Sequence, residues 1–269
     1  MTKLARQITR DEVAAYRHAG VVLLRGVLDL QAVNTLRRSI DQALLSMQDA
    51  SPEQASSAGK STAMFDIGLA ARLREFRRFT LNGPGPEIAA ALLGGDQINF
   101  FGDQIFVKEP GTRVRTAFHQ DAGYFEIAGE QCCVLWIPVD PVTMENGSMM
   151  YWRGSHKSGA IYESQAGQSA PLPDIESKLD GYDIVHFDIE PGDLVVHHYR
   201  TVHGATGNAS RYQVRRAASL RYCGDDVRFQ TRPGMPGQHR RITTLKDGDP
   251  LSGTDFPVVW RRRFDQQAA

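Results

Sequence analysis

The residues of this 269-residue chain that could carry chemistry most directly are a histidine and an aspartate two positions apart. His119 and Asp121 lie in "TAFHQDAGYF", and side chains at i and i+2 of an extended segment project to the same side. These two side chains can therefore grip one metal ion while Gln120 points away. Because two ligands alone bind a metal weakly, we expect a third ligand from another strand.

Three histidines in the stretch "EPGDLVVHHYRTVHG" could supply the third ligand: His197, His198 and His203. His197 and His198 are neighbours in a predicted strand, so we expect one to face the core and the other the solvent or a neighbouring element. His203 follows at the end of that strand, directly before a glycine, where functional side chains are common. This position favours His203 and leaves the other two open. Two histidines with one carboxylate are the ligand set of non-heme Fe(II) oxygenases.

A pair of arginines follows downstream, in "QVRRAASLRY". Arg215 and Arg216 are adjacent, so on a strand they point to opposite faces. An arginine facing the interior would be a buried charge, which requires an anionic partner. A cosubstrate with two carboxylates would supply that partner, because the guanidinium fork matches a carboxylate. The alternative is two surface arginines.

The first third of the chain is predicted to be mainly helical. Thr9 and Glu12 have the spacing of a capping box, and Gly20 ends the helix that they begin. The further elements expected here are a strand over 21–28, a helix capped by Asp29 with apolar positions up to Met47, a mobile loop over 48–63, and helices near 69–79 and 86–93.

From about residue 97 the chain changes to short strand-like runs separated by Gly, Pro, Asp and Asn. Because no long helices lie between these strands, the pattern favours a β-sandwich or β-barrel. We expect one domain over 1–269, with a helical part over about 1–95 and a barrel core over about 97–225. The runs are "INFFGDQIFVKEPG", "QCCVLWIPVDP", "SMMYW", "YDIVHFDIEPGDLVVHHY" and "RRAASLRYCG".

Composition argues against several classes of partner. The chain has 31 Lys+Arg and 31 Asp+Glu, which argues against a nucleic-acid surface. It has no apolar run long enough for a membrane span and no apolar leader, so we expect a cytoplasmic protein that acts on a small molecule. Cys132, Cys133 and Cys223 are too few for a disulfide framework and are expected to be buried thiols. Nothing in the composition indicates an oligomeric state.

Beyond these residues, the chain resembles the phytanoyl-CoA dioxygenase (PhyH) family of Fe(II)- and 2-oxoglutarate-dependent oxygenases. The resemblance covers roughly residues 97–222, and its motifs occur in the order and near the spacing of that family. They are "FVKEPG" (106–111), "FHQD" (118–121), "LWIPVD" (135–140), "ENGSMMYWRGSHK" (145–157), "PGDLVVHHYRTVHGATGN" (191–208) and "RRAASLRY" (215–222).

The resemblance implies a mainly β fold with flanking helices, built as a double-stranded β-helix, the jelly-roll barrel of cupin-like proteins. It implies that His119, Asp121 and His203 are the iron ligands. Arg215, with Arg216 as the fallback, would pair with the distal carboxylate of 2-oxoglutarate. Gln104 and Trp136 stand at positions where members of the family contact the cosubstrate.

The activity that the resemblance implies is oxidation of a C–H bond of a small molecule with Fe(II), 2-oxoglutarate and O2, with release of succinate and CO2 and hydroxylation as the expected outcome. The alternative is a cupin-like metal-binding protein or a non-oxidative metalloisomerase. One departure is Ala205, where the family often has a serine, so a hydroxyl for the cosubstrate would come from Thr206 or Thr143 or be absent. The segments 48–63 and 159–182 are candidates for a lid.

Overall fold

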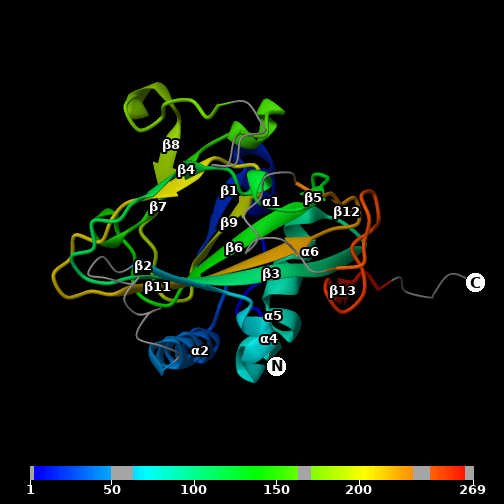
Figure 1. Ribbon diagram of the computed structural model, residues 1–269, viewed down its shortest axis with the longest axis horizontal. Coiled ribbons are helices and arrows are strands. Elements are labelled where there is room, and N and C mark those ends of the chain that lie inside the picture. Colours follow the sequence, from blue (N-terminus) through cyan, green and yellow to red (C-terminus); the bar gives the residue numbers. More distant parts are fainter. Residues whose placement is uncertain (1–2, 50–62, 163–170, 233–242, 264–269) are drawn as a thin grey trace, which may run out of the picture.

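The computed structural model describes residues 3–49, 63–162, 171–232 and 243–263, and it is built mainly of β-sheet with helices packed outside (Figure 1). The lid candidates fall partly outside these residues, because 50–62 and 163–170 are not among them. Among the described helices, none combines the length and the apolar composition needed to cross a bilayer.

The helices lie mostly before residue 95, as expected. They are α1 Arg10–Ala19, α2 Leu30–Asp49, α4 Leu69–Arg72, α5 Arg74–Asn82 and α6 Gly85–Leu93, with short 3-10 helices η1 Asp121–Gly123, η2 Met144–Asn146, η3 Ser155–Ser158 and η4 Leu179–Gly181.

The strands occupy most of the remaining described chain. They are β1 Val21–Leu24, β2 Ala63–Ile67, β3 Gln97–Lys108, β4 Thr116–His119, β5 Ile127–Ala128, β6 Cys132–Pro138, β7 Met149–Trp152, β8 Ile184–His186, β9 Leu194–His198, β10 His203–Ala205, β11 Arg215–Cys223, β12 Arg228–Phe229 and β13 Val258–Arg261.

The first helix begins and ends where its side chains predict. The Thr9 hydroxyl accepts the Glu12 N–H at 3.2 Å, and the Glu12 carboxylate accepts the Thr9 N–H at 2.8 Å. Gly20 has φ +73°, a left-handed conformation that ends a helix without strain in glycine. Asp29 caps α2 in turn, since its carboxylate accepts the Ala32 N–H at 2.6 Å. The single helix predicted near 69–79 is instead two, because Leu73 is extended and separates α4 from α5.

The strands form two main antiparallel sheets. The larger has the order β1-β9-β6-β11-β3-β13 with β2 also paired to β3, and the smaller has the order β4-β10-β7-β8. In Figure 1 the helices α2, α4 and α5 lie below the larger sheet, and β4, β7 and β8 of the smaller sheet lie above it. The expected mainly β fold with flanking helices is therefore confirmed at this level.

The two faces of the larger sheet differ in chemistry. On β11, Ala218, Leu220 and Tyr222 pack with the helices in the largest apolar cluster of the protein. Because side chains alternate along a strand, Arg215 and Arg221 project to the opposite face, toward the smaller sheet. The larger sheet thus presents an apolar face to the helices and places polar residues between the sheets.

The three cysteines behave as expected from their spacing. Cys132, Cys133 and Cys223 are buried free thiols. Cys132 and Cys133 lie in different apolar clusters, as neighbours on a strand should.

Candidate metal centre

The smaller sheet brings the two predicted histidine ligands together. His203 of β10 lies directly opposite His119 of β4 in the antiparallel register, although 84 positions separate them in the chain. The strand β4 ends at His119, and the 3-10 helix η1 then turns Asp121 back toward the histidines. One ligand atom of each residue lies within 4.8 Å of the other two, a spacing at which the three could hold one metal ion.

Both histidines are oriented by backbone carbonyls. The Nδ1 atom of His119 lies 2.9 Å from the Ala117 carbonyl, and Nδ1 of His203 lies 2.9 Å from the Thr201 carbonyl. A carbonyl only accepts, so each Nδ1 carries a proton, and in the neutral ring the lone pair is then on Nε2. This is the arrangement that orients histidines at metal sites. The neutral nitrogens and the carboxylate oxygen suit a divalent first-row metal such as Fe(II).

The electrostatics around Asp121 favour its ionised form. Burial raises the pKa of Asp121, but the hydrogen bond from His197 and the fields of His203, His197 and Arg221 lower it further, to well below its usual range. Burial, with the neighbouring His119 and His197, lowers the pKa of His203 well below its usual value. A deprotonated carboxylate beside a neutral imidazole is what metal binding requires.

His197 supports the carboxylate from the larger sheet. Its Nε2 lies 3.4 Å from Asp121 Oδ2, and its ring centroid lies 4.4 Å from that of His203. Tyr151 packs against both of these rings, with centroids 5.3 Å from His197 and 6.0 Å from His203. The sequence did not predict this supporting role, since His197 and Asp121 meet only through the pairing of distant strands.

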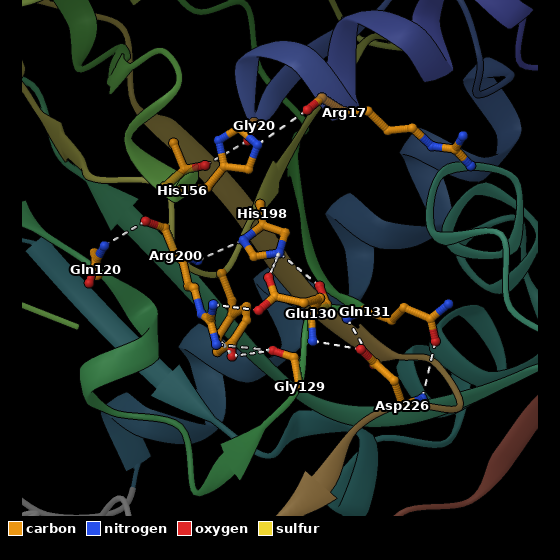
Figure 2. A network of polar contacts seen from close by, with 12 residues as sticks. Arg17, Gly20, Gln120, Gly129, Glu130, Gln131, His156, His198, Arg200 and Asp226 are labelled. Carbon is orange, nitrogen blue, oxygen red and sulfur yellow. Dashed lines mark hydrogen bonds and ion pairs between the residues drawn. The ribbon is translucent and has the colours of Figure 1, made fainter. Parts of the chain in front are cut away.

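The segment between the two ligands is anchored by Gln120, which points away from the metal group as predicted. Its side chain is 1% exposed, and its Nε2 donates to the Arg200 carbonyl at 2.7 Å. Its Oε1 accepts the Tyr162 N–H at 2.9 Å. Figure 2 shows Gln120 reaching Arg200, whose guanidinium in turn contacts Glu130.

The same polar network explains His198. Its Nε2 donates to the Glu130 carbonyl at 2.7 Å and its Nδ1 accepts the Arg200 N–H at 3.1 Å, so both ring nitrogens are committed (Figure 2). Burial, then the fields of His156, Arg200 and His197, lower the pKa of His198 to about 3, although its bond to Glu130 opposes the shift. Both His197 and His198 are buried, and they serve opposite faces of the sheet.

Arg215 is a buried cation that forms no salt bridge within the part of the chain that the structure describes. It is 1% exposed, and neither its Nε nor its Nη1 has a hydrogen-bond partner. Its guanidinium lies over the ring of Trp136, 5.5 Å from the centroid. Lys108 lies directly opposite Arg215 in the β3–β11 register. A second buried cation therefore flanks the first, which like charges disfavour unless an anion lies between them.

Gly147 packs beneath these two cationic side chains. A Cβ at this position would lie 3.2 Å from Cδ of Lys108 and 3.4 Å from Nε of Arg215. Lys108 Nζ donates to the Thr206 carbonyl. Burial lowers the pKa of Lys108 to about 7, and the fields of Arg215 and Arg115 lower it in the same direction.

Arg216, the fallback anchor, is occupied elsewhere. Its Nη2 and Nε donate to Asp140 at 2.7 and 2.9 Å, and its Nη1 donates to Asp41 at 2.6 Å. The two hydroxyls considered near Ala205 are also committed, since Thr206 donates to the Met144 carbonyl at 3.1 Å and Thr143 caps η2.

Gln104 of β3 lies beside Arg221 of β11. The sequence analysis did not single out Arg221. Arg221 Nη2 donates to Gln104 Oε1 at 2.5 Å. The alternation from Arg215 along β11 could have identified Arg221, because residues six apart on a strand share a face.

Comparison with solved structures finds the same architecture in 2-oxoglutarate-dependent enzymes. The carbocyclase SnoK of nogalamycin biosynthesis, described as non-heme and alpha-ketoglutarate-dependent, has a TM-score of 0.76 and 26% identity, covering 97% of this chain and 100% of its own. The epimerase SnoN of the same biosynthesis has a TM-score of 0.72 and 25% identity, covering 96% of this chain and 98% of its own.

Comparison of sequences gives the family. A probable phytanoyl-CoA dioxygenase of Caenorhabditis elegans is 26% identical over 165 residues, 55% of this chain and 53% of that protein. A phytanoyl-CoA dioxygenase of Arabidopsis thaliana is 29% identical over 124 residues, 44% of this chain and 42% of that protein. The chain thus matches about half the length of these curated relatives. The family model for phytanoyl-CoA dioxygenase (PhyH) matches residues 16–217, most of the chain, and the protein therefore belongs to the PhyH family.

Proposed function

We propose that this protein is a non-heme Fe(II)- and 2-oxoglutarate-dependent oxygenase that oxidises a C–H bond of a small molecule. The observation that carries the proposal is the buried guanidinium of Arg215, which forms no salt bridge with any described residue and projects from β11 toward the smaller sheet. Burying an arginine without an anion costs free energy, and a bound carboxylate would offset that cost. Membership of the PhyH family supports the same reading.

In this proposal His119, Asp121 and His203 would hold the metal ion. Fe(II) with 2-oxoglutarate and O2 supplies the oxidising power, with succinate and CO2 as products and hydroxylation as the expected outcome for the organic substrate. The carbonyls of Ala117 and Thr201, which accept from Nδ1 of each histidine, hold the rings so that Nε2 is the nitrogen left for the metal. His197 holds the carboxylate of Asp121 in place.

The cosubstrate pocket is proposed to end at Arg215 and Lys108. Arg215 offers a planar fork of donors, and Trp136 fixes the plane of that fork from below. Lys108 adds a second cation from the facing strand. Gln104 lies on the same strand as Lys108, nearer to the metal group.

The competing function is a metal-binding protein or metalloisomerase that does not use 2-oxoglutarate. It would account for the three metal ligands, but it offers no anion for Arg215 and Lys108. The organic substrate of this chain is a proposal only at the level of a small molecule, as for the solved SnoN complex with nogalamycin RO.

We also infer that the two sheets close as a double-stranded β-helix and that residues 1–269 form a single domain. The coverage of 97% of this chain by one solved enzyme supports the single domain.

The test is binding of 2-oxoglutarate to the Fe(II)-loaded protein under argon, measured by calorimetry. Loss of a charge-assisted hydrogen bond in Arg215→Met should weaken binding by about 10- to 100-fold. Arg216→Met is the matched control, because it removes the neighbouring arginine whose charge already meets two carboxylates. Equal affinity of the wild type and Arg215→Met, or no binding at all, would contradict the proposal.

A further inference from the structure

Two of the three buried cysteines face each other across the larger sheet. Cys132 of β6 lies directly opposite Cys223 of β11 in the antiparallel register, and these two strands are neighbours in the centre of the sheet (Figure 1). Both side chains belong to the same apolar cluster and are 0% exposed. Cys133 differs, because it packs in the cluster on the helix side and lies opposite Tyr222 and His198 in the sheet.

The backbone hydrogen bonds show that the two cysteines are a close pair. The Cys132 carbonyl accepts the Tyr199 N–H at 3.2 Å on the β9 side, so it points away from β11. The next pair along the ladder is hydrogen-bonded, since the Gly224 N–H donates to the Gln131 carbonyl at 2.7 Å. Cys132 and Cys223 are therefore a non-hydrogen-bonded pair, in which the Cα atoms lie about 4.5 Å apart.

This spacing falls within the range of a disulfide, whose Cα atoms lie about 4.4–6.8 Å apart. The Cβ atoms of opposite residues are about 4.5–5.5 Å apart, against about 3.5–4.5 Å in a disulfide, so only a small approach of the strands is needed. The pair also lies at the end of both strands, because β6 begins at Cys132 and β11 ends at Cys223. Ends of elements open locally more readily than their centres, which gives a small oxidant a route to these thiols.

The charges around the thiols favour Cys132 over Cys133 as the reactive group. Burial raises the pKa of Cys133 well above its usual value, and the field of Cys132 raises it further, so Cys133 stays protonated. Cys132 has a cation within electrostatic reach: burial lowers the pKa of Arg221, and the charges of Asp121, Asp103 and Cys132 oppose that shift. A thiolate beside a cation is the form of cysteine that attacks an oxidant.

We propose that Cys132 and Cys223 form a disulfide when the protein meets hydrogen peroxide, and that they are a reversible oxidation site. The Cys132 sulfur attacks one peroxide oxygen, the O–O bond breaks and water leaves, so Cys132 becomes a sulfenic acid. The Cys223 sulfur then attacks Cys132: the S–S bond forms, the S–O bond breaks, and a second water leaves with the proton of the Cys223 thiol. Two thiols are thereby oxidised by two electrons, and one peroxide is reduced to two waters. No step uses a metal ion or 2-oxoglutarate, so this site is independent of the proposed function.

The experiment treats the full chain with hydrogen peroxide in the presence of a chelator, which keeps iron from decomposing the peroxide. One sample is alkylated, digested without reduction and searched for linked peptides by mass spectrometry. A second sample is denatured, and its remaining thiols are counted. Cys132→Ala is treated in the same way, and Cys133→Ala is the matched control. Circular dichroism checks that each variant folds, and the wild-type result decides alone if a variant does not.

We expect the wild type to lose two of its three thiols, to yield a peptide that links Cys132 to Cys223, and to regain both thiols with dithiothreitol. Cys133→Ala should yield the same link, because Cys133 packs on the other face of β6. Cys132→Ala should yield no linked peptide. The site would be overturned if the wild type kept all three thiols at a peroxide concentration that oxidises the amino acid cysteine, or if it linked Cys133 instead. A link that forms only after urea has unfolded the chain would also overturn it, since the folded register would then not be its cause.

Discussion

Replacing Gln120 with leucine should separate the support of the metal group from the metal ligands themselves. The Gln120 side chain is buried, points away from the metal group and, in the described part of the chain, makes its hydrogen bonds to backbone groups. Its amide bonds to the Arg200 carbonyl and the Tyr162 N–H at 2.7 and 2.9 Å, with a longer contact of 3.3 Å to the Ala160 carbonyl. Leucine has a similar volume, so the change removes these bonds and leaves the packing nearly intact.

The expected loss of stability follows from the two shorter bonds. Each leaves a buried backbone group unpaired, at a cost of about 1–3 kcal/mol, so the free energy of unfolding should fall by about 2–6 kcal/mol. A domain of this kind has about 5–15 kcal/mol in total, so we expect a folded but weakened protein. Metal affinity should fall by about 10- to 100-fold, because the supporting groups of a metal site orient its ligands.

Two assays on Gln120→Leu measure the two effects. Urea unfolding followed by circular dichroism gives the stability, and competition with a chelator for Co(II) gives the metal affinity. Gln131→Leu is the matched control, since the Gln131 side chain also bonds backbone groups, those of Asp226 and Leu93 at 3.2 and 3.4 Å, but lies outside the segment between the two ligands. It should lose stability and keep its metal affinity. If Gln120→Leu loses stability and binds Co(II) as tightly as the wild type, Gln120 serves only the fold.

Three further predictions concern charge and backbone geometry. Because the pKa of His198 falls to about 3 on folding, the unfolded chain binds a proton below pH 6.5 that the folded chain refuses, and stability is lost as pH falls toward 3. Between pH 7 and 5 the free energy of unfolding, measured with urea, should therefore fall by about 2 kcal/mol more in the wild type than in His198→Gln. Lys108→Met should weaken 2-oxoglutarate about 10-fold in calorimetry and leave 2-oxovalerate, which lacks the distal carboxylate, unchanged. Gly147→Ala should lower the thermal unfolding free energy by about 1–3 kcal/mol, because φ is +105° and the added Cβ meets Lys108; an unchanged melting temperature would contradict this.

Local signals in the sequence predicted much of the helical part and the ligand spacing. The capping box at Thr9 and the cap at Asp29 act over three residues, so the chain shows them without tertiary information. The HxD spacing and the opposite orientation of Arg215 and Arg216 follow from the alternation of a strand in the same way.

Long-range pairing set the rest of the site, and the sequence could not show it. His197 of the larger sheet reaches Asp121, which follows β4 of the smaller sheet, across 76 positions, and this contact depends on how the two sheets pack. The pairing of β11 with β3 likewise places Lys108 opposite Arg215 and brings Arg221 next to Gln104. The break between α4 and α5 depends on one extended residue, Leu73. Residues 69–79 contain no glycine or proline that would predict this break from the sequence.

The most direct test of the proposed function is the visible absorption of the Fe(II)-loaded protein under argon as 2-oxoglutarate is added. A 2-oxo acid that chelates Fe(II) through its carboxylate and keto oxygens gives a charge-transfer band. We expect the band to appear and saturate with the wild type, to be lost in His119→Ala, and to require more 2-oxoglutarate in Arg215→Met. A wild-type protein that binds Fe(II) and shows no band would contradict the oxygenase proposal and favour a metal protein that does not use 2-oxoglutarate.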